Sequence, residues 1–218
     1  VVNRSGALSN GAHNLWLIDL ARDVSTRFTV ASNRDLYPVW SPDGSSIVFA
    51  SNRDGVYNLY RKSVSGGGND ELLLKSGAIK HASDLSPDGR YLLYDESNPK
   101  TKQDLMLLPD PGRTPGGKKP TPFLQTEFNE QNGAFSPDGK WIAYEADESG
   151  KYEIYVQPFP STGAKRRVST NGGRWAKWRG DGKELFFLRD STVMAVEVKG
   201  GASFEAGVPQ PLFETRLI

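Results

Sequence analysis

Residues 40–50 read Trp-Ser-Pro-Asp-Gly-Ser-Ser-Ile-Val-Phe-Ala, which places a four-residue turn motif between two apolar runs. In such a motif the proline fixes φ near −65°, the aspartate can cap the turn, and the glycine takes positive φ at no steric cost. The flanking runs are short and rich in aromatic and β-branched residues, which is typical of β-strands. The stretch therefore predicts a tight β-hairpin.

The same signature occurs four times along the chain. It starts at Ser41, Ser86 and Ser136, and an altered copy starts at Arg179, so that the repeat length is roughly 43–50 residues. Each copy is followed by the same order of apolar segments and turns, and no long window has a helical period. We expect the aspartates and glycines of the motif to form the turns: Asp43, Gly44, Asp88, Gly89, Asp138, Gly139, Asp181 and Gly182.

Four short strands per repeat of this length predict an all-β fold, a β-propeller built of four-stranded antiparallel blades. We expect one partial propeller over residues 1–218, whose blades cover approximately residues 1–34 (partial), 35–77, 78–126, 127–171 and 172–218. In the partial blade, residues 14–19 match a third strand and residues 27–30 a fourth. An open arc would expose two blade edges, so we expect either self-association through them or loss of a blade by truncation or proteolysis.

Composition excludes several classes of protein. The 27 Lys and Arg residues nearly balance 26 Asp and Glu residues, which argues against a basic nucleic-acid arm or an acidic tail. There is no cysteine, which excludes disulfides, zinc-thiolate sites and cysteine nucleophiles. No apolar run approaches the ~20 residues that span a bilayer. None of this fixes the cellular compartment.

The repeats resemble the WD40-like repeats of TolB-type propellers, a six-bladed family that also includes the tricorn and dipeptidyl-peptidase propellers. The resemblance is carried by the motif itself and by residues 47–55 and 58–60, Ile-Val-Phe-Ala-Ser-Asn-Arg-Asp-Gly and Asn-Leu-Tyr. More narrowly, four stretches resemble the C-terminal sensor propeller of bacterial, notably acidobacterial, membrane-bound serine/threonine kinases: residues 71–77, 123–130, 155–160 and 204–209. The kinase catalytic motifs themselves are absent.

The sequence contains no complete catalytic motif. Residues 112–119 imitate a phosphate loop, but Lys119 replaces the required Ser or Thr and prolines follow, so we interpret them as an inter-strand loop. No Gly-x-Ser-x-Gly elbow occurs. His13 is expected in a turn of the partial blade, and it stands too far from His81 in blade order for the two to share a metal. The acidic pairs at residues 95–96 and 147–148 are expected in solvated turns. We therefore expect no catalytic residues, no metal and no cofactor.

Recognition would use the loops at one end of the propeller, because the first strand of each blade lines the central channel and the short turns lie at the opposite end. The residues expected at the channel mouth are Tyr37, His81, Asn132, Arg174 and Trp175. They would bind a protein or peptide partner, or a small ligand. The alternative is that they only close contacts between blades.

Residues 161–200 are mildly basic and contain Trp175 and Trp178. Such a segment could bind single-stranded nucleic acid, but a solvated face with core tryptophans is the commoner meaning, and we expect no nucleic-acid partner.

Two functions remain open. The first is a non-catalytic binding or sensor module, which the resemblance implies is the C-terminal region of a membrane-associated bacterial kinase, on either side of the membrane. The second is the propeller of a TolB-, tricorn- or prolyl-oligopeptidase-like protein, which gates substrate for a hydrolase domain outside this chain.

Overall fold

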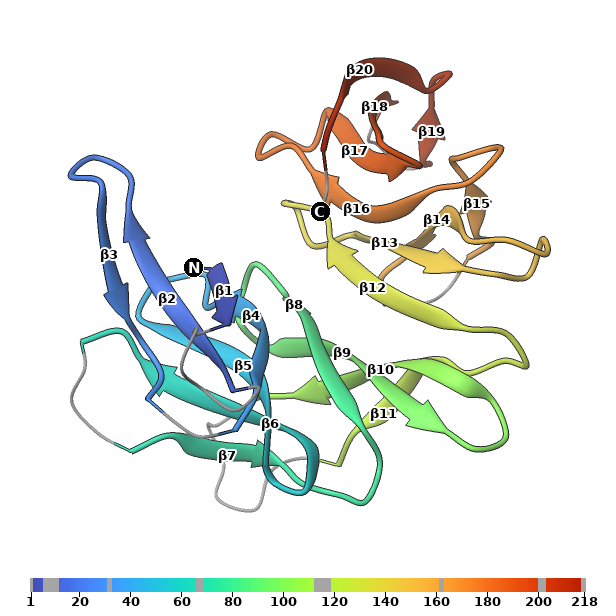
Figure 1. The fold of residues 1–218 in the computed structure, drawn as a ribbon. Helices are drawn as coiled ribbons and strands as arrows, with labels where there is room; N and C mark the ends of the chain where they lie inside the picture. The colour runs from blue at the N-terminus through green and yellow to red at the C-terminus, as the bar shows by residue number, and fades with distance from the viewer. Residues whose placement is uncertain are drawn as a thin grey trace.

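The computed structural model describes residues 2–5, 12–30, 33–65, 69–111, 119–160, 163–199 and 203–216. Within these ranges every regular element is a β-strand, and all the strands pair antiparallel in five separate sheets (Figure 1). The all-β fold predicted from the repeats is confirmed.

The five sheets follow one another along the chain, and we call them blades 1 to 5. Blade 1 contains β1 (Val2–Ser5), β2 (His13–Asp19) and β3 (Val24–Arg27). Blade 2 contains β4 (Asp35–Trp40), β5 (Ser46–Asp54), β6 (Val56–Ser63) and β7 (Glu71–Leu74). Blade 3 contains β8 (Lys80–Leu85), β9 (Tyr91–Asn98), β10 (Lys102–Pro109) and β11 (Thr121–Leu124).

Blades 4 and 5 repeat the arrangement. Blade 4 contains β12 (Glu130–Phe135), β13 (Trp141–Ala146), β14 (Glu153–Pro158) and β15 (Arg166–Arg167). Blade 5 contains β16 (Arg174–Trp178), β17 (Glu184–Arg189), β18 (Thr192–Lys199), β19 (Glu205–Ala206) and β20 (Gln210–Glu214). Both β19 and β20 pair with β18, at different stretches of it.

The blades pack face to face around a common centre. The first strands of blades 2 to 5 are neighbours, in the order β4, β8, β12, β16, and each of the last three also lies against strands of the preceding blade. Figure 1 shows this as an arc that does not close into a ring. The arc agrees with the partial propeller that the sequence predicted.

The hydrophobic core consists of four layers, one between each pair of consecutive blades. Between blades 3 and 4, for example, Leu93 and Leu105 pack with Ile142 and Tyr144, and all four side chains are fully buried or nearly so. The apolar faces of each blade are therefore buried against the neighbouring blades, as expected for the sheets of a propeller.

The turn motif has nearly the same geometry in all four copies. In the first, Asp43 Oδ1 accepts hydrogen bonds from Ser41 Oγ at 2.6 Å and from the Ser45 N–H at 3.0 Å. The same bonds form at Asp88 and Asp138, and at Asp181 the Arg179 guanidinium replaces the serine hydroxyl. The motif glycines lie in the left-handed region, with φ between 68° and 73°: Gly44, Gly89, Gly139 and Gly182.

The motif also joins the blades, which the sequence did not predict. The proline of one turn lies against the glycine of the next: a β-carbon on Gly139 would meet Pro87 at 3.7 Å, and one on Gly182 would meet Pro137 at 3.7 Å. The repeated turns therefore form a contact line around one end of the molecule.

Two local expectations are wrong. The fourth strand of blade 1 was expected at residues 27–30 but is β3, Val24–Arg27, because Asp19 accepts the Ala21 and Arg22 N–H groups and so closes the hairpin early. His13, expected in a turn, is the first residue of β2.

The motif-like residues 112–118 lie outside the described residues. Where the structure is described, it contains no helix long and apolar enough to cross a bilayer.

Candidate functional site

The first strands of blades 2 to 5, which we call the inner strands, converge on a pocket of about 170 Å³. We call it the channel pocket. All four strands contribute to it, and three of the five predicted site residues line it, Tyr37 from β4, Asn132 from β12 and Trp175 from β16. The other lining residues are Pro38, Val39, Ala82, Ser83, Gly133, Ala176 and Lys177.

A backbone irregularity places these three side chains. Each inner strand shifts register against its neighbour in the same blade. At the shift Tyr37, Asn132 and Trp175 adopt nearly identical left-handed conformations, with φ of 54°, 53° and 54°. Positive φ is uncommon for residues other than glycine and is found mostly where the surroundings enforce it. In β8 the matching residue is Ala82, which does not take positive φ.

Two buried carboxylates hold this backbone in place. Asp95, in β9 of blade 3, accepts the N–H of Asn132 in blade 4 at 3.1 Å and the hydroxyl of Ser83 at 2.8 Å. Glu145, at the same position in blade 4, accepts the N–H of Trp175 in blade 5. Each carboxylate therefore fixes the left-handed residue of the next blade.

The expectation of a solvated turn is wrong for Asp95. The residue is 4% exposed because β9 continues past its apolar run, so that the side chain points between blades 3 and 4. Burial, and the nearby Glu145 charge, raise the pKa of Asp95 to about 7, against the lowering by its two hydrogen bonds. Burial likewise raises the pKa of Glu145.

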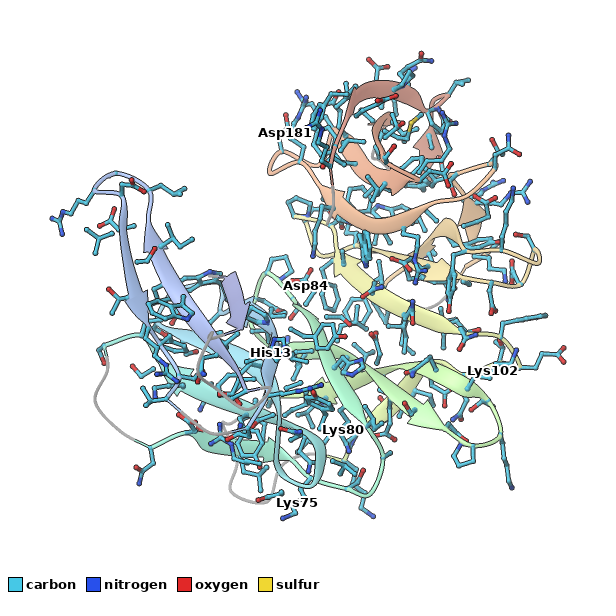
Figure 2. All side chains as sticks on the ribbon, in the orientation of Figure 1. His13, Lys75, Lys80, Asp84, Lys102 and Asp181 are labelled. Atoms are coloured by element: carbon cyan, nitrogen blue, oxygen red, sulfur yellow. The ribbon has the colours of Figure 1, made fainter. Side chains whose placement is uncertain are left out.

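Asp84 provides a further hydrogen bond between blades 3 and 4. It lies near one end of β8, and Lys80 lies at the other end (Figure 2). Its Oδ2 accepts the N–H of Phe135 in β12 at 2.8 Å, and its Oδ1 accepts the N–H of Leu85 at 2.9 Å. Burial raises the pKa of Asp84, and the Lys177 charge opposes this rise.

His81 packs against Tyr37, one of the residues that line the channel pocket. Its ring stacks on Tyr37 with 4.2 Å between centroids, and Tyr57 meets it edge-on at 5.9 Å. Burial lowers the pKa of His81, which favours the neutral imidazole. The histidine therefore supports Tyr37 rather than facing the pocket.

Arg174 does not line the channel pocket but lies at its rim, beside the lining residue Trp175. Its guanidinium lies 4.2 Å from the ring centre of Tyr152 and 5.7 Å from that of Trp175, and its Nε lies 3.3 Å from Glu145. Trp175 and Tyr37 remain 51% and 44% exposed. Large aromatic side chains beside an arginine, partly open to solvent, are typical of recognition surfaces.

Several polar groups around the pocket are already engaged in hydrogen bonds. Glu145 also lies within hydrogen-bond distance of Asn132 Nδ2, at 3.1 Å, and Gln131 Nε2, at 3.4 Å. Over the part of the chain that is described, no three His, Cys, Asp or Glu side chains group as a metal site.

The sequence analysis missed Asp84, Asp95 and Glu145. A signal was available for two of them, because Asp95 and Glu145 each come directly after the apolar run of a second strand, four residues long in both repeats. An acidic residue that continues a buried strand, rather than following a Gly or Pro, indicates a buried carboxylate.

Comparison with protein families finds a match to the TolB beta propeller domain over residues 6–109. The chain is 28% identical over 181 residues to a Bacillus subtilis protein named as an uncharacterized peptidase, YuxL, a match that covers 66% of this chain and 27% of the relative. It is 29% identical over 159 residues to the uncharacterized protein Atu1656 of Agrobacterium fabrum, covering 71% of this chain and 50% of the relative. The chain thus spans half or less of the length of these relatives.

Solved structures show the same fold at low identity. A TolB of Acinetobacter baumannii superimposes with a TM-score of 0.71 at 19% identity, covering 94% of this chain and 50% of the other. A TolB-type protein of Agrobacterium tumefaciens gives a TM-score of 0.72 at 19% identity, covering 88% and 73%. Identity at this level carries the fold and not the function.

Proposed function

Since the chain is a TolB-like β-propeller domain, we propose that it is a non-catalytic recognition module and that the channel pocket is its binding site. Its ligand would be a protein or peptide segment, or a small molecule, held against Tyr37 and Trp175 with Arg174 at the rim.

One observation carries this proposal, the common conformation of Tyr37, Asn132 and Trp175. Three blades hold three different side chains in the same left-handed conformation, aimed at one pocket. Strained backbone persists only where neighbouring structure over-determines it, and it concentrates at ligand sites. The two aromatic side chains among them, Tyr37 and Trp175, remain about half exposed, although burying them would be favourable.

The role of the carboxylates supports recognition over catalysis. A general acid or base must lie within reach of the substrate. Asp95 and Glu145 instead accept backbone N–H groups of the next blade, and both are almost completely buried. Their raised pKa values follow from burial within this scaffold.

A displayed library of random dodecapeptides, selected on the immobilised chain, would test the proposal. We expect selected peptides to lose binding at least about tenfold with Trp175→Ala and with Arg174→Ala, since truncating an aromatic or arginine hot-spot residue costs about 2 kcal/mol or more. Leu72→Ala is the matched control, because Leu72 is 46% exposed on β7, the outer strand of blade 2.

Circular dichroism would establish that each variant folds. Peptides that bind folded Trp175→Ala and Arg174→Ala as tightly as the unaltered chain would contradict the assignment of the site. Hydrolysis of a selected peptide by the purified chain would contradict the non-catalytic role.

The alternative is a propeller that gates substrate for a hydrolase domain outside this chain. The name of the B. subtilis relative, an uncharacterized peptidase of which this chain matches 27%, favours it. The kinase-linked sensor role stays a prediction from sequence resemblance. The sequence of the whole gene would distinguish the hydrolase-linked role from the kinase-linked role, because hydrolase and kinase domains are recognised by different motifs.

A further inference from the structure

At the end of the molecule that carries the turn motifs, consecutive blades also meet through a cluster of three side chains. Between blades 3 and 4 this place is filled by three aromatic rings, with Phe159 lying 5.2 Å from both Tyr91 and Phe135. Between blades 4 and 5, Phe204 lies 5.4 Å from Trp141 and 6.2 Å from Trp178. In each case one ring comes from the start of a second strand, one from the end of the next inner strand, and one from beyond the third strand.

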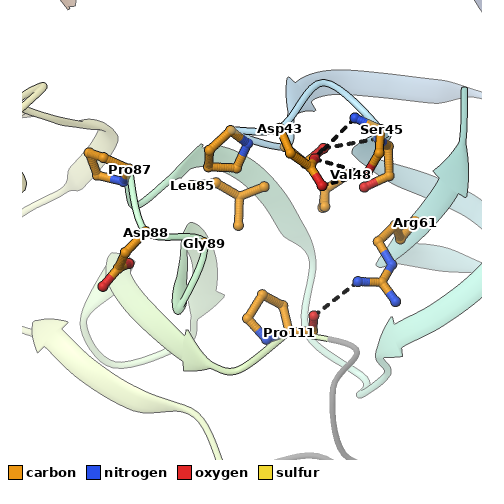
Figure 3. Close-up of a pocket in the computed structure, with 12 residues that line it drawn as sticks. Asp43, Ser45, Val48, Arg61, Leu85, Pro87, Asp88, Gly89 and Pro111 are labelled. Carbon is orange, nitrogen blue, oxygen red and sulfur yellow. Dashed lines mark hydrogen bonds between the residues drawn. The ribbon is translucent and has the colours of Figure 1, made fainter.

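The corresponding places between blades 2 and 3 carry no ring. Ser46 begins β5, Leu85 ends β8, and Asp110 and Pro111 follow β10. A hollow of about 300 Å³ remains, and it reaches the core residue Val48 (Figure 3). We call it the interblade hollow. A hollow of about 450 Å³ between blades 4 and 5 is floored instead by the indoles of Trp141 and Trp178, on which Phe204 is already packed.

The walls of the interblade hollow match an aromatic ring. Its inner surface is apolar, formed by Val48, Leu85 and Pro111. The Arg61 guanidinium forms one wall, and its Nη1 donates a 3.2 Å hydrogen bond to the Pro111 carbonyl (Figure 3). Its Nη2 also lies 2.6 Å from the Glu71 carboxylate. A guanidinium fixed in this way can stack on an inserted ring.

The rim of the hollow is acidic. Asp43 and Asp88 both line it. Hydrogen bonds from the neighbouring serine hydroxyls and backbone N–H groups lower the pKa of both carboxyls, to about 2 for Asp43, so that they stay ionised at neutral pH. The Arg61 charge is paired with Glu71. The rim therefore favours a cation over an anion.

We propose that the interblade hollow is a docking site for an aromatic side chain of a protein partner, presented beside a basic residue. The partner's ring would occupy the place that Phe159 and Phe204 occupy at the next two interfaces, and its basic residue would lie against Asp43 and Asp88. The site is separate from the channel pocket, because the turns lie at the other end of the inner strands, so it goes beyond the function proposed above.

The test is an NMR titration of the isotope-labelled chain with three synthetic peptides: acetyl-Lys-Phe-Lys-amide, acetyl-Lys-Ala-Lys-amide and acetyl-Glu-Phe-Glu-amide. We expect the first to shift the amide signals of Ser45, Val48 and Gly89 in a saturable manner. We expect the other two to bind at least about tenfold more weakly, because one lacks the ring and the other has the wrong charge.

Two variants locate the site. Ser46→Tyr reproduces the residue found at Tyr91, whose N–H makes the same bond to the motif serine as that of Ser46, and should fill the hollow and weaken binding at least about tenfold. Asp88→Asn keeps the turn's acceptor oxygen and removes only the charge, so it should weaken the Lys-Phe-Lys peptide severalfold even if Ser46→Tyr fails to fold. Leu212→Ala, at a position 52% exposed on β20 of blade 5, should leave binding unchanged.

Equal affinity for the Lys-Phe-Lys and Lys-Ala-Lys peptides would overturn the proposal, as would unchanged binding by folded Ser46→Tyr or by Asp88→Asn. Shifts confined to the channel pocket, or no shift at millimolar peptide, would also overturn it.

Discussion

At the scale of single residues, the most informative side chains are those that stand at one repeat position and differ in chemistry. Ala50, Asp95, Glu145 and Leu188 occupy this position in blades 2 to 5. Where it is acidic, the residue across the blade interface is held at positive φ, at Asn132 and Trp175, and where it is Ala50 the facing Ala82 is not. A change of one side chain thus accompanies a change of backbone conformation in the next blade.

Asp95 gives the fold a pH dependence whose direction follows from its raised pKa. Because the folded chain holds the proton more tightly than the ordinary Asp pKa of 3.8, Asp95 contributes stability at low pH, and this contribution is lost as the pH rises from about 4 through about 7. Asp95→Asn keeps an acceptor oxygen without the charge. Between pH 5 and pH 8 the free energy of unfolding should fall about 1–3 kcal/mol more in the unaltered chain than in Asp95→Asn.

Urea denaturation at the two pH values measures this difference. Asp84 and Glu145 also have raised pKa values and His81 a lowered one, so only the comparison with Asp95→Asn isolates the one group. Asp43→Asn is the control, because a carboxyl with a pKa of about 2 stays ionised throughout. Parallel curves for the unaltered chain and Asp95→Asn would mean that Asp95 is ionised over the whole range.

At the scale of the element, the inner strands are restricted by how closely they approach the preceding blade. β12 runs past β9 and β10, and Gly133 lies directly against leucine side chains of those strands. A β-carbon there would lie 2.3 Å from Leu93 Cδ2 and 3.3 Å from Leu105 Cδ2, and both leucines are fully buried. The missing side chain, rather than backbone freedom, explains the glycine.

Gly133→Ala should therefore destabilise the fold by about 1–3 kcal/mol, as overpacking of a filled core does. Gly77→Ala is the matched control, because a β-carbon on Gly77 would have nothing within 4 Å and the φ of this residue is not positive; its effect should stay within about 1 kcal/mol. Chemical denaturation of both variants provides the comparison. Equal stability of the two would show that Leu93 moves aside at little cost.

At the scale of the whole molecule, stability lies between blades rather than within them. Each core layer is shared by two consecutive blades, and hydrogen bonds from backbone N–H groups to the carboxylates of Asp84, Asp95 and Glu145 cross the same interfaces. Stacked units that contact only their neighbours lose cooperativity when one interface is weakened. Damage at one interface should therefore appear first in the blade beyond it.

Glu145→Ala tests this coupling between blades 4 and 5. It removes the acceptor of the Trp175 N–H and the partner of Arg174, and should cost about 2–4 kcal/mol because buried polar groups lose their partners. Hydrogen exchange followed by mass spectrometry should show faster exchange in β16 and β17, while β5 and β6 keep their protection. Glu205→Ala, at an exposed position of β19, is the control. Uniformly faster exchange in all blades would contradict interface-limited stability.

Local sequence was enough to predict the all-β repeat, the turns and the face that carries the channel pocket, because turn chemistry and strand alternation are local and recur in every copy. Repeat position also placed Tyr37, Asn132 and Trp175 near one another. Only the folded chain reveals that Asp95 is buried, that His81 supports Tyr37, that Gly133 has no room for a side chain, and that Ser46, Leu85 and Pro111 leave a hollow. Those features depend on what faces a residue across a blade interface, where contacts such as Glu145–Trp175 and Asp84–Phe135 join residues 30 and 51 positions apart along the chain.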